Sequence, residues 1–165
     1  MVRDMFEYRI ATEADLEQIW NMNIADNADD ARWVRWKEEY IAYNEQGMAV
    51  TFVAVADGRP VGEGTLLLSP ACKAVSWTTH LADGVTVANV NALRIRKEYE
   101  GQGHISRLMR LMEEYAATRG IRRLTIGVEA RETRNLAIYL HWGYDAFLLS
   151  EVDEGELVLY YEKEL

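Results

Sequence analysis

LRIRKEYEGQGHISRLMRLM, residues 93–112, joins a short apolar strand to an amphipathic helix through a glycine turn. The helix is predicted from Gly103 to Arg119, because apolar residues recur at the helical period and Gly120 follows where that period stops. Glycines let the backbone approach a ligand closely, and the first amides of a helix have no intrahelical acceptors. The turn therefore has the local pattern of an anion site, typically for phosphate. An ordinary strand-to-helix connection has the same local pattern, so the rest of the chain must decide.

The length and charge of the chain limit the number of domains and the kinds of partner that it can have. Its 165 residues predict a single domain, residues 1–165, and the formal net charge of -9 argues against nucleic-acid binding. The N-terminal segment MVRDMFEYRI has no apolar run of signal-peptide length, and no stretch approaches a membrane span. We expect a cytoplasmic protein with no membrane association.

Cysteine and histidine usage gives no sign of a metal or thiol site. Cys72 is the single cysteine and is expected to be a small apolar residue. The three histidines, His80, His104 and His141, lack the spacing of metal ligands, so no metal site is predicted.

Hydrophobic periodicity predicts a mixed α/β fold built on one sheet. Thr12 is predicted to cap the first helix, and Glu63, which interrupts the third strand, to face solvent. Residues 69–84 are expected to form a long excursion. Short turns favour antiparallel pairing, except in the strand-helix-strand unit around Gly103, which should be parallel and right-handed. Strands are expected at 6–10, 48–56, 60–68, 85–95, 124–128, 147–152 and 157–162, and helices after Thr12 and at 31–46, 103–119 and 133–142.

The second helix carries an aromatic stripe of Trp33, Trp36, Tyr40 and Tyr43. Two interpretations are open. The rings pack on the sheet, or some of them line a pocket for an organic substrate with cation-π contacts to an amine.

Two motifs, YEGQGHISRLM (99–109) and NLAIYLHWGY (135–144), together resemble the GNAT superfamily of acyl-CoA-dependent N-acetyltransferases. The order of the predicted elements is similar to that fold over essentially the full length. The resemblance implies that the amides of the glycine turn hold the pyrophosphate of coenzyme A, and that acetyl-CoA is the co-substrate. It also implies a small-molecule or peptide amine as the acceptor.

The residues implied to bind coenzyme A follow from the match to these motifs. The strand end would hold pantetheine through backbone amides, the glycine turn would hold the pyrophosphate, and Asn135 lies on the same helical face as Tyr139. These residues are Arg94, Ile95, Arg96, Gly101, Gln102, Gly103, His104, Ile105, Ser106 and Asn135.

The chain departs from the family pattern at two positions of the turn. Glu100 stands where Arg or Gln is usual, and is expected to offer its amide rather than its side chain. Ile105 stands where Gly or Ala is usual, which removes a close approach but keeps an amide.

Acyl transfer to an amine needs an uncharged nucleophile, an oxyanion donor and an acid for the departing thiolate. Tyr139 is the predicted general acid, with Gly143 and Tyr144 completing its motif. Glu129, at the end of a strand, is the predicted base. It is equally compatible with a solvated carboxylate, and His80 is a weaker choice. No dedicated base is required if the amine loses its proton to water.

Two other functions remain open at this stage. One is a non-catalytic acyl-CoA-binding sensor or interaction module of the same fold. The other is a nucleotide-binding domain of a different kind. This sequence lacks the Lys-Ser/Thr that follows the glycines in a P-loop, which argues against that alternative. The oligomeric state is also open, and the candidate edge for a homodimer is the terminal hairpin with Leu157, Leu159 and Tyr161.

Overall fold

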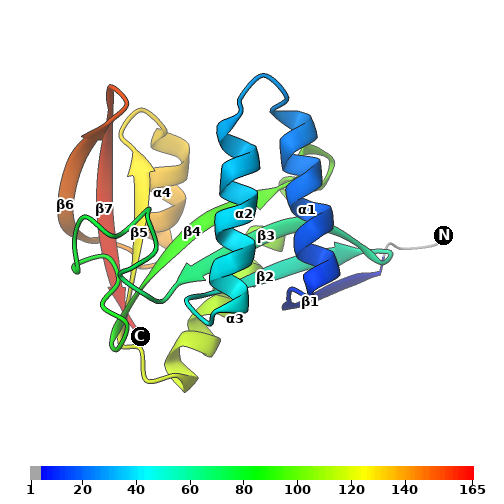
Figure 1. Cartoon of the computed structure of the whole chain (residues 1–165). Helices are drawn as coiled ribbons and strands as arrows, with labels where there is room; N and C mark the ends of the chain where they lie inside the picture. The colour runs from blue at the N-terminus through cyan, green and yellow to red at the C-terminus, as the bar shows by residue number, and fades with distance from the viewer. Residues whose placement is uncertain (1–4) are drawn as a thin grey trace. The chain divides into compact units, whose positions relative to one another are not determined.

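The computed structural model describes residues 5–165, so residues 1–4 of the segment MVRDMFEYRI lie outside the described range. Within that range the helices and strands follow the predicted order (Figure 1). The strands are β1 (Phe6–Ile10), β2 (Ala49–Ala56), β3 (Arg59–Leu67), β4 (Val87–Ile95), β5 (Arg123–Glu129), β6 (Ala146–Asp153) and β7 (Glu156–Glu164). The α-helices are α1 (Glu13–Asp26), α2 (Arg32–Glu45), α3 (His104–Thr118) and α4 (Thr133–His141).

The strands form one mixed sheet in the order β1-β2-β3-β4-β5-β7-β6. β4 and β5 are the parallel pair, while the pairings of β1 with β2, β5 with β7 and β6 with β7 are antiparallel. The predicted fold class, mostly antiparallel with one parallel strand-helix-strand unit, is confirmed.

The chain divides into two compact units. The first consists of the chain up to Leu66 together with Ala92–Glu114, and the second of Leu67–Asn91 together with Tyr115–Leu165. The first unit therefore contains β1, α1, α2, β2, almost all of β3, the end of β4 and most of α3. The second contains the start of β4, β5, α4, β6 and β7.

In the first unit, α1 and α2 lie side by side (Figure 1). The β2–β3 hairpin turns through Asp57 and Gly58, both with positive φ (49° and 83°), as a tight two-residue turn requires. Side chains alternate across β3. Glu63 faces α1, where the Asn23 amide donates to it at 2.7 Å, and a Cβ on the next residue, Gly64, would lie 2.7 Å from Met112 Cε of α3. Helices α1 and α3 thus cover opposite faces of this strand.

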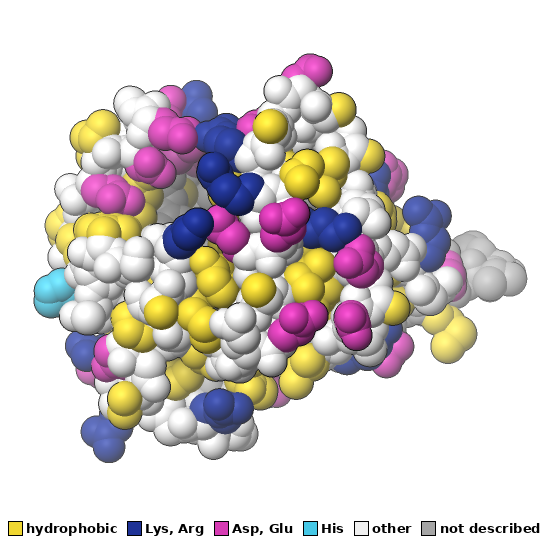
Figure 2. Space-filling model, in the orientation of Figure 1, with side chains coloured by type: hydrophobic (Ala, Val, Ile, Leu, Met, Phe, Trp, Pro, Cys, Tyr) yellow, Lys and Arg dark blue, Asp and Glu magenta, His cyan; other side chains and the backbone are white. Residues whose placement is uncertain are grey.

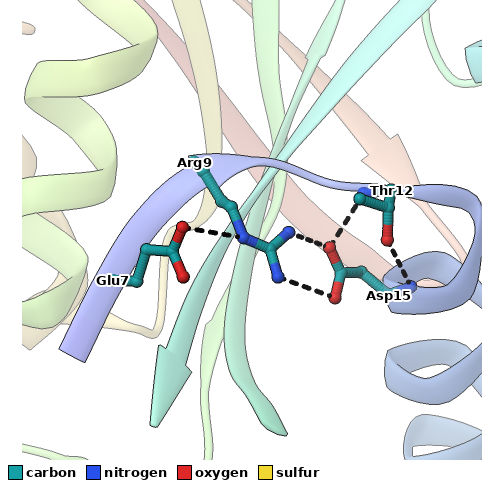
Figure 3. A network of polar contacts seen from close by, with 4 residues as sticks. All are labelled: Glu7, Arg9, Thr12 and Asp15. Carbon is teal, nitrogen blue, oxygen red and sulfur yellow. Dashed lines mark hydrogen bonds and ion pairs between the residues drawn. The ribbon is translucent and has the colours of Figure 1, made fainter. Parts of the chain in front are cut away.

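A polar network fixes the start of α1 (Figure 3). Asp15 N donates to Thr12 Oγ1 at 3.1 Å and Thr12 N donates to Asp15 Oδ2 at 2.8 Å, which is a capping box. Arg9 on β1 binds the same carboxylate through both terminal nitrogens and also contacts Glu7. The predicted cap at Thr12 is confirmed, and the ion pair ties the helix to the neighbouring strand.

In the second unit, β5 is buried along most of its length and has a partner on each side. The excursion between β3 and β4 contains turns and bends, with no helix or strand in residues 69–84. Its apolar residues Cys72, Val75 and Leu81 are buried. Near its end the Asp83 carboxylate accepts hydrogen bonds from the amides of Val85, Thr86 and Val87. The excursion is therefore an ordered segment held by its own core and turns.

Candidate functional site

The glycine turn lies in the first unit, between the end of β4 and α3. Gly101 and Gly103 have φ values of 74° and 86°, a conformation that L residues with a side chain rarely adopt. Among residues 5–165, the amides of residues 101–106 donate to no backbone carbonyl, and the first amide to do so is that of Arg107, to Gly103 O at 3.1 Å. A Cβ added at either glycine would meet nothing within 4 Å. The turn thus offers several amides beside open space, as an anion site at a helix N-terminus requires.

Glu100 contributes to this turn differently from the prediction. Its amide donates to Lys97 O at 3.3 Å, closing the short 3₁₀ turn Lys97–Tyr99, so it is not available to a phosphate. The Glu100 side chain lines a neighbouring cavity. The expectation that Glu100 offers its amide is wrong, because a local turn already satisfies that donor.

His104 anchors the first residue of α3. Its Nδ1 shares a hydrogen bond of 2.6 Å with Tyr8 Oη, and its ring centroid lies 4.4 Å from that of Phe6. Burial, helped by the nearby charge of Arg107, lowers the pKa of His104, so the imidazole is neutral at pH 7. A neutral, buried ring cannot attract a phosphate by its charge. His104 can therefore contribute its amide, while its side chain holds the turn against β1.

The arginines of the β4 end are directed at other side chains. The Arg94 guanidinium lies 5.3 Å from the ring centroid of Trp20 and 4.8 Å from that of Trp33. Arg96 forms ion pairs with Asp26 at 3.2 Å and Glu98 at 3.7 Å. The predicted contribution of this segment to coenzyme A is through backbone amides, and the amide of Arg96 already donates to Val61 O at 2.8 Å.

The backbone of β4 is irregular just before this segment. Ala92 has a positive φ of 51°, although it is not glycine. The parallel register with β5 covers Val87–Val90 opposite Arg123–Ile126 and precedes that residue. Positive φ at a residue with a Cβ costs energy and is concentrated at functional sites. Ala92 thus marks the start of a segment whose conformation the surrounding structure imposes.

A cavity of about 420 Å³ lies in the first unit, and the sequence did not predict that Glu63 lines it. The cavity is lined by residues of α1, α2, β3 and β4 and of the turn after β4, including Asn23, Trp33, Glu63, Arg94 and Arg96. Glu63 is only 1% exposed. The prediction that it faces solvent is wrong, because its face of β3 is covered by α1.

The structure divides the aromatic stripe of α2 between the core and the cavity lining, and its contact with a substrate stays a prediction. Tyr40 and Tyr43 are buried in the core. Trp33 lines the cavity, and its cation-π partner is Arg94 of the same chain. Trp36 is paired with Arg32 in the same way, at 5.3 Å.

Charge on the helices beside the cavity is mixed. Acidic and basic side chains are interspersed over α1 and α2 on the face shown in Figure 2. Asp30 and Arg32 form one ion pair of 2.7 Å, and Glu17 and Lys37 another of 2.6 Å. These helices therefore present no continuous basic surface, in keeping with the net charge of -9.

Three predicted residues, Tyr139, Glu129 and Asn135, belong to the second unit, and the other nine belong to the first. Tyr139 is half-buried on α4, its ring 6.0 Å from that of Trp142. Burial, followed by the charge of Glu132, raises the pKa of Tyr139, so its hydroxyl is protonated at neutral pH. The helix ends where Tyr144 N donates to Tyr139 O at 3.0 Å.

The two polar partners of Tyr139 in the prediction make local contacts. Glu129 Oε2 accepts a hydrogen bond from Arg131 Nε at 2.8 Å. Asn135 is exposed and donates to Glu132 at 2.7 Å. Glu129 stays a prediction from its place at the end of β5, and Asn135 stays one from its place on the same helical face as Tyr139.

Cys72, Asn89 and His80 have different surroundings. Cys72 is fully buried, and burial raises the pKa of its thiol to about 11, so it is an inert core residue as predicted. Asn89 is buried and donates to Thr125 Oγ1 at 3.0 Å, which links β4 to β5. His80 is exposed in the excursion. In the part of the chain that the structure describes, no three His, Cys, Asp or Glu residues are grouped to hold a metal, and no helix could span a bilayer.

Comparison with known families and structures gives a consistent result. The family model for the acetyltransferase (GNAT) family matches residues 13–144. An IAA acetyltransferase from Bacillus cereus is 16% identical and has a TM-score of 0.66, with 98% of this chain and 100% of the other covered. A ribosomal-protein-alanine N-acetyltransferase from Brucella melitensis is 18% identical with a TM-score of 0.71, and coverage is 96% and 99%.

A third solved structure contains coenzyme A. The PaiA N-acetyltransferase from Thermoplasma acidophilum, in complex with coenzyme A, is 17% identical with a TM-score of 0.65, and coverage is 98% and 99%. At these identities the structural likeness shows the fold. Comparison with curated protein sequences found no match.

Proposed function

The chain belongs to the GNAT acetyltransferase family, and we propose that it transfers an acetyl group from acetyl-CoA to a primary amine of a small molecule or peptide. The observation that carries the proposal is the glycine turn of residues 101–106, whose amides donate to no backbone carbonyl of residues 5–165 and where a Cβ added at Gly101 or Gly103 would meet nothing within 4 Å. This turn can bind a pyrophosphate without a lysine, because amides at a helix N-terminus carry partial positive charge. When bound, acetyl-CoA supplies the acyl thioester.

The chain would bind coenzyme A mainly through backbone groups, with a few side chains in addition. Gly101, Gln102, Gly103, His104, Ile105 and Ser106 would hold the pyrophosphate through their amides, with the Ser106 hydroxyl as a further donor. Arg94, Ile95 and Arg96 would hold pantetheine through backbone groups, and Asn135 is assigned to coenzyme A because it lies on the same helical face as Tyr139. Ile105 keeps its amide, so its bulk does not remove the donor.

Tyr139 is the proposed proton donor to the leaving thiolate. Burial raises its pKa, so the phenol is protonated at pH 7 and can donate a proton but cannot act as a base. A Tyr139→Phe variant should lower kcat by roughly 100-fold with acetyl-CoA affinity unchanged, within the range for loss of a general acid. Unchanged turnover in a folded variant that binds acetyl-CoA would remove Tyr139 from the mechanism.

Glu129 is the base proposed from its place at the strand end. One of its oxygens is already bound by Arg131, so the role requires the other oxygen or a change of partner. A Glu129→Gln variant whose pH-rate profile matches that of the wild type would eliminate this assignment.

Calorimetry with acetyl-CoA, followed by measurement of free thiol release over a panel of amines, tests the proposal as a whole. Binding with amine-dependent thiol release supports the transferase. Binding without turnover on any amine supports the alternative, a non-catalytic acyl-CoA sensor. No binding of acetyl-CoA would contradict both functions.

A further inference from the structure

Three buried polar atoms in the first unit lack a hydrogen-bond partner among the described residues: Trp20 Nε1, Glu63 Oε1 and Arg94 Nε. The three residues form one cluster, because Arg94 stacks on Trp20 and lies 3.7 Å from Glu63 Oε2. Buried polar groups in folded proteins are almost always paired, and each exception needs an explanation such as a water or a ligand. Three exceptions in one cluster indicate a site that a bound molecule completes.

The cluster lies at a cavity large enough for such a molecule. Glu63 and Arg94 both line the space of about 420 Å³, and cavities that bind small molecules are roughly 300–1,000 Å³. The Glu63 carboxylate is almost fully buried, and the Arg94 side chain is 32% exposed. The pair therefore presents one acidic and one basic group to the same cavity.

Three of the other charged side chains around the cavity form ion pairs with one another. Arg96 is bound to Asp26 of α1 and to Glu98 of the following turn, at 3.2 and 3.7 Å. Lys97 and Glu100 of that turn complete the charged lining. By contrast, Glu63 and Arg94 face each other at a distance too long for a hydrogen bond, and Asn23 satisfies only one Glu63 oxygen. Among the described lining residues, the Glu63–Arg94 pair thus holds the buried side-chain atoms that have no hydrogen-bond partner.

The unused atoms define the chemistry of the ligand. Of the three residues, Glu63 and Arg94 line the cavity: Arg94 offers N–H donors, which an anionic oxygen accepts, and Glu63 offers an acceptor, which an amine N–H satisfies. The Arg94 guanidinium lies against the rings of two tryptophans, Trp20 and Trp33, which orders it before any ligand arrives. A small molecule with an amine and a carboxylate a few atoms apart satisfies both halves of the cluster.

We propose that this cavity is the acceptor site and that it selects an amine bearing a carboxylate, such as an α-amino acid, with the amine at Glu63 and the carboxylate at Arg94. The inference rests on the proposed acetyltransferase function. The cavity is lined by Arg94, Ile95 and Arg96, the segment proposed to hold pantetheine, and by Glu100, the residue before the glycine turn. The acceptor would therefore lie against the same segment as the thioester arm, within one unit of the chain.

Glu63 also provides the proton acceptor that the reaction needs. An ammonium nitrogen gives one proton to the Glu63 carboxylate and becomes a neutral amine. That nitrogen forms the N–C bond to the acetyl carbonyl carbon as the C–S bond breaks, and the thiolate takes a proton from the general acid. The second amine proton is released when the amide is neutralised, so one thiol, one amide and one proton are produced.

The environment of Glu63 suits this role. Burial raises the pKa of Glu63 above its usual value, against the opposing effects of Arg94 and the Asn23 hydrogen bond. A carboxylate with a raised pKa is a better proton acceptor near neutral pH. Glu129, the base proposed from the sequence, instead makes an ion pair near the surface.

Matched ligand pairs test the selectivity without any mutation. Calorimetry with the wild-type protein and coenzyme A should compare L-leucine with 3-methylbutylamine, L-phenylalanine with phenethylamine, and L-lysine with cadaverine. The two members of each pair differ by the carboxylate. At least one amino acid should bind tenfold or more tightly than its amine. Equal or tighter binding of the amine in every pair, or no binding of any amino acid, overturns the proposal and leaves a buried water as the partner of the cluster.

Two variants locate the effect. In Arg94→Gln the amino acid and its matched amine should bind with nearly equal affinity. Glu63→Gln should weaken amino-acid binding by tenfold or more. Exposed residues provide matched controls, Arg59→Gln and Glu38→Gln, which should leave binding unchanged. Circular dichroism and thermal unfolding establish that each variant is folded. An Arg94→Gln variant that is folded and keeps the full preference contradicts the assignment.

The outcomes separate this proposal from the general one. Thiol release with amines that lack a carboxylate, at rates equal to those with amino acids, keeps the acetyltransferase and removes the zwitterion site. Amino-acid binding by a protein that does not bind acetyl-CoA keeps the site and removes the acetyltransferase.

Discussion

A Gly103→Ala substitution tests whether the glycine turn is a binding site. Gly103 has φ of 86°, and an added Cβ would meet nothing within 4 Å, so the change introduces no clash. Its cost is the backbone strain of an L residue in the left-handed region, about 1–2 kcal/mol. The free energy of unfolding in urea should fall by that amount if the turn keeps its conformation, and by less if the turn relaxes.

Relaxation of the turn would move the amides that precede α3. Hydrogen bonds to a charged group contribute about 1.5–3 kcal/mol each, so the loss of one should weaken acetyl-CoA binding roughly 10- to 100-fold. Titration calorimetry with acetyl-CoA measures this directly.

Gly47 provides a matched control in the same unit. It follows α2, has φ of 73°, and likewise has nothing within 4 Å of an added Cβ. Gly47→Ala should therefore cost a similar amount of stability and leave acetyl-CoA affinity unchanged. Equal affinities for the two variants and the wild type, with a smaller loss of stability in Gly103→Ala than in Gly47→Ala as the sign that the turn has relaxed, would refute the binding role of the turn. Equal losses of affinity in both variants would show that the effect is one of general stability.

Three further predictions concern the rest of the chain. Burial alone would raise the pKa of Asp15, but its hydrogen bonds, chiefly from Arg9, lower that pKa below its usual value. The resulting stability is present above about pH 4, where the unfolded carboxyl is ionised, and is lost as the pH falls through the native pKa. Asp15→Asn should flatten this acid limb in urea titrations at several pH values. Gly127→Ala would place a Cβ 2.7 Å from Tyr160 Cε1, in a ring whose hydroxyl is fixed, so urea unfolding should show a loss of about 1–3 kcal/mol; no loss would mean that the ring moves freely. Cys72 should react with a thiol reagent at pH 8 only at the rate of unfolding, and rapid labelling of the native protein would contradict its burial.

Most of the fold could be predicted from the sequence because its signals are local. The cap at Thr12, the turn at Asp57 and Gly58, and the helix after Gly103 each depend on residues a few positions apart. The parallel pairing of β4 with β5 was also predictable, since a helix separates the two strands. The element boundaries differ from the predictions by one or two residues where helices and strands end.

The glycine turn was identified from the sequence, but the sequence did not show which of its amides are already hydrogen-bonded. The amide of Glu100 was expected to be available to a ligand, whereas it donates to Lys97 O in the 3₁₀ turn. The hydrogen bond between His104 and Tyr8 joins residues 96 positions apart, and no local pattern contains it.

The sequence by itself determined the family and the order of the elements, because periodicity, glycine positions and caps act over one or two turns of chain. Only the tertiary structure decided whether the Glu63 side chain is buried or exposed. Its neighbours in the chain are small residues that favour an exposed strand as readily as a buried one. Asn23 and Arg94, from distant segments, surround it only after α1 covers β3. Burial is a property of what packs over a residue, so the charge in the cavity could be recognised only in the folded chain.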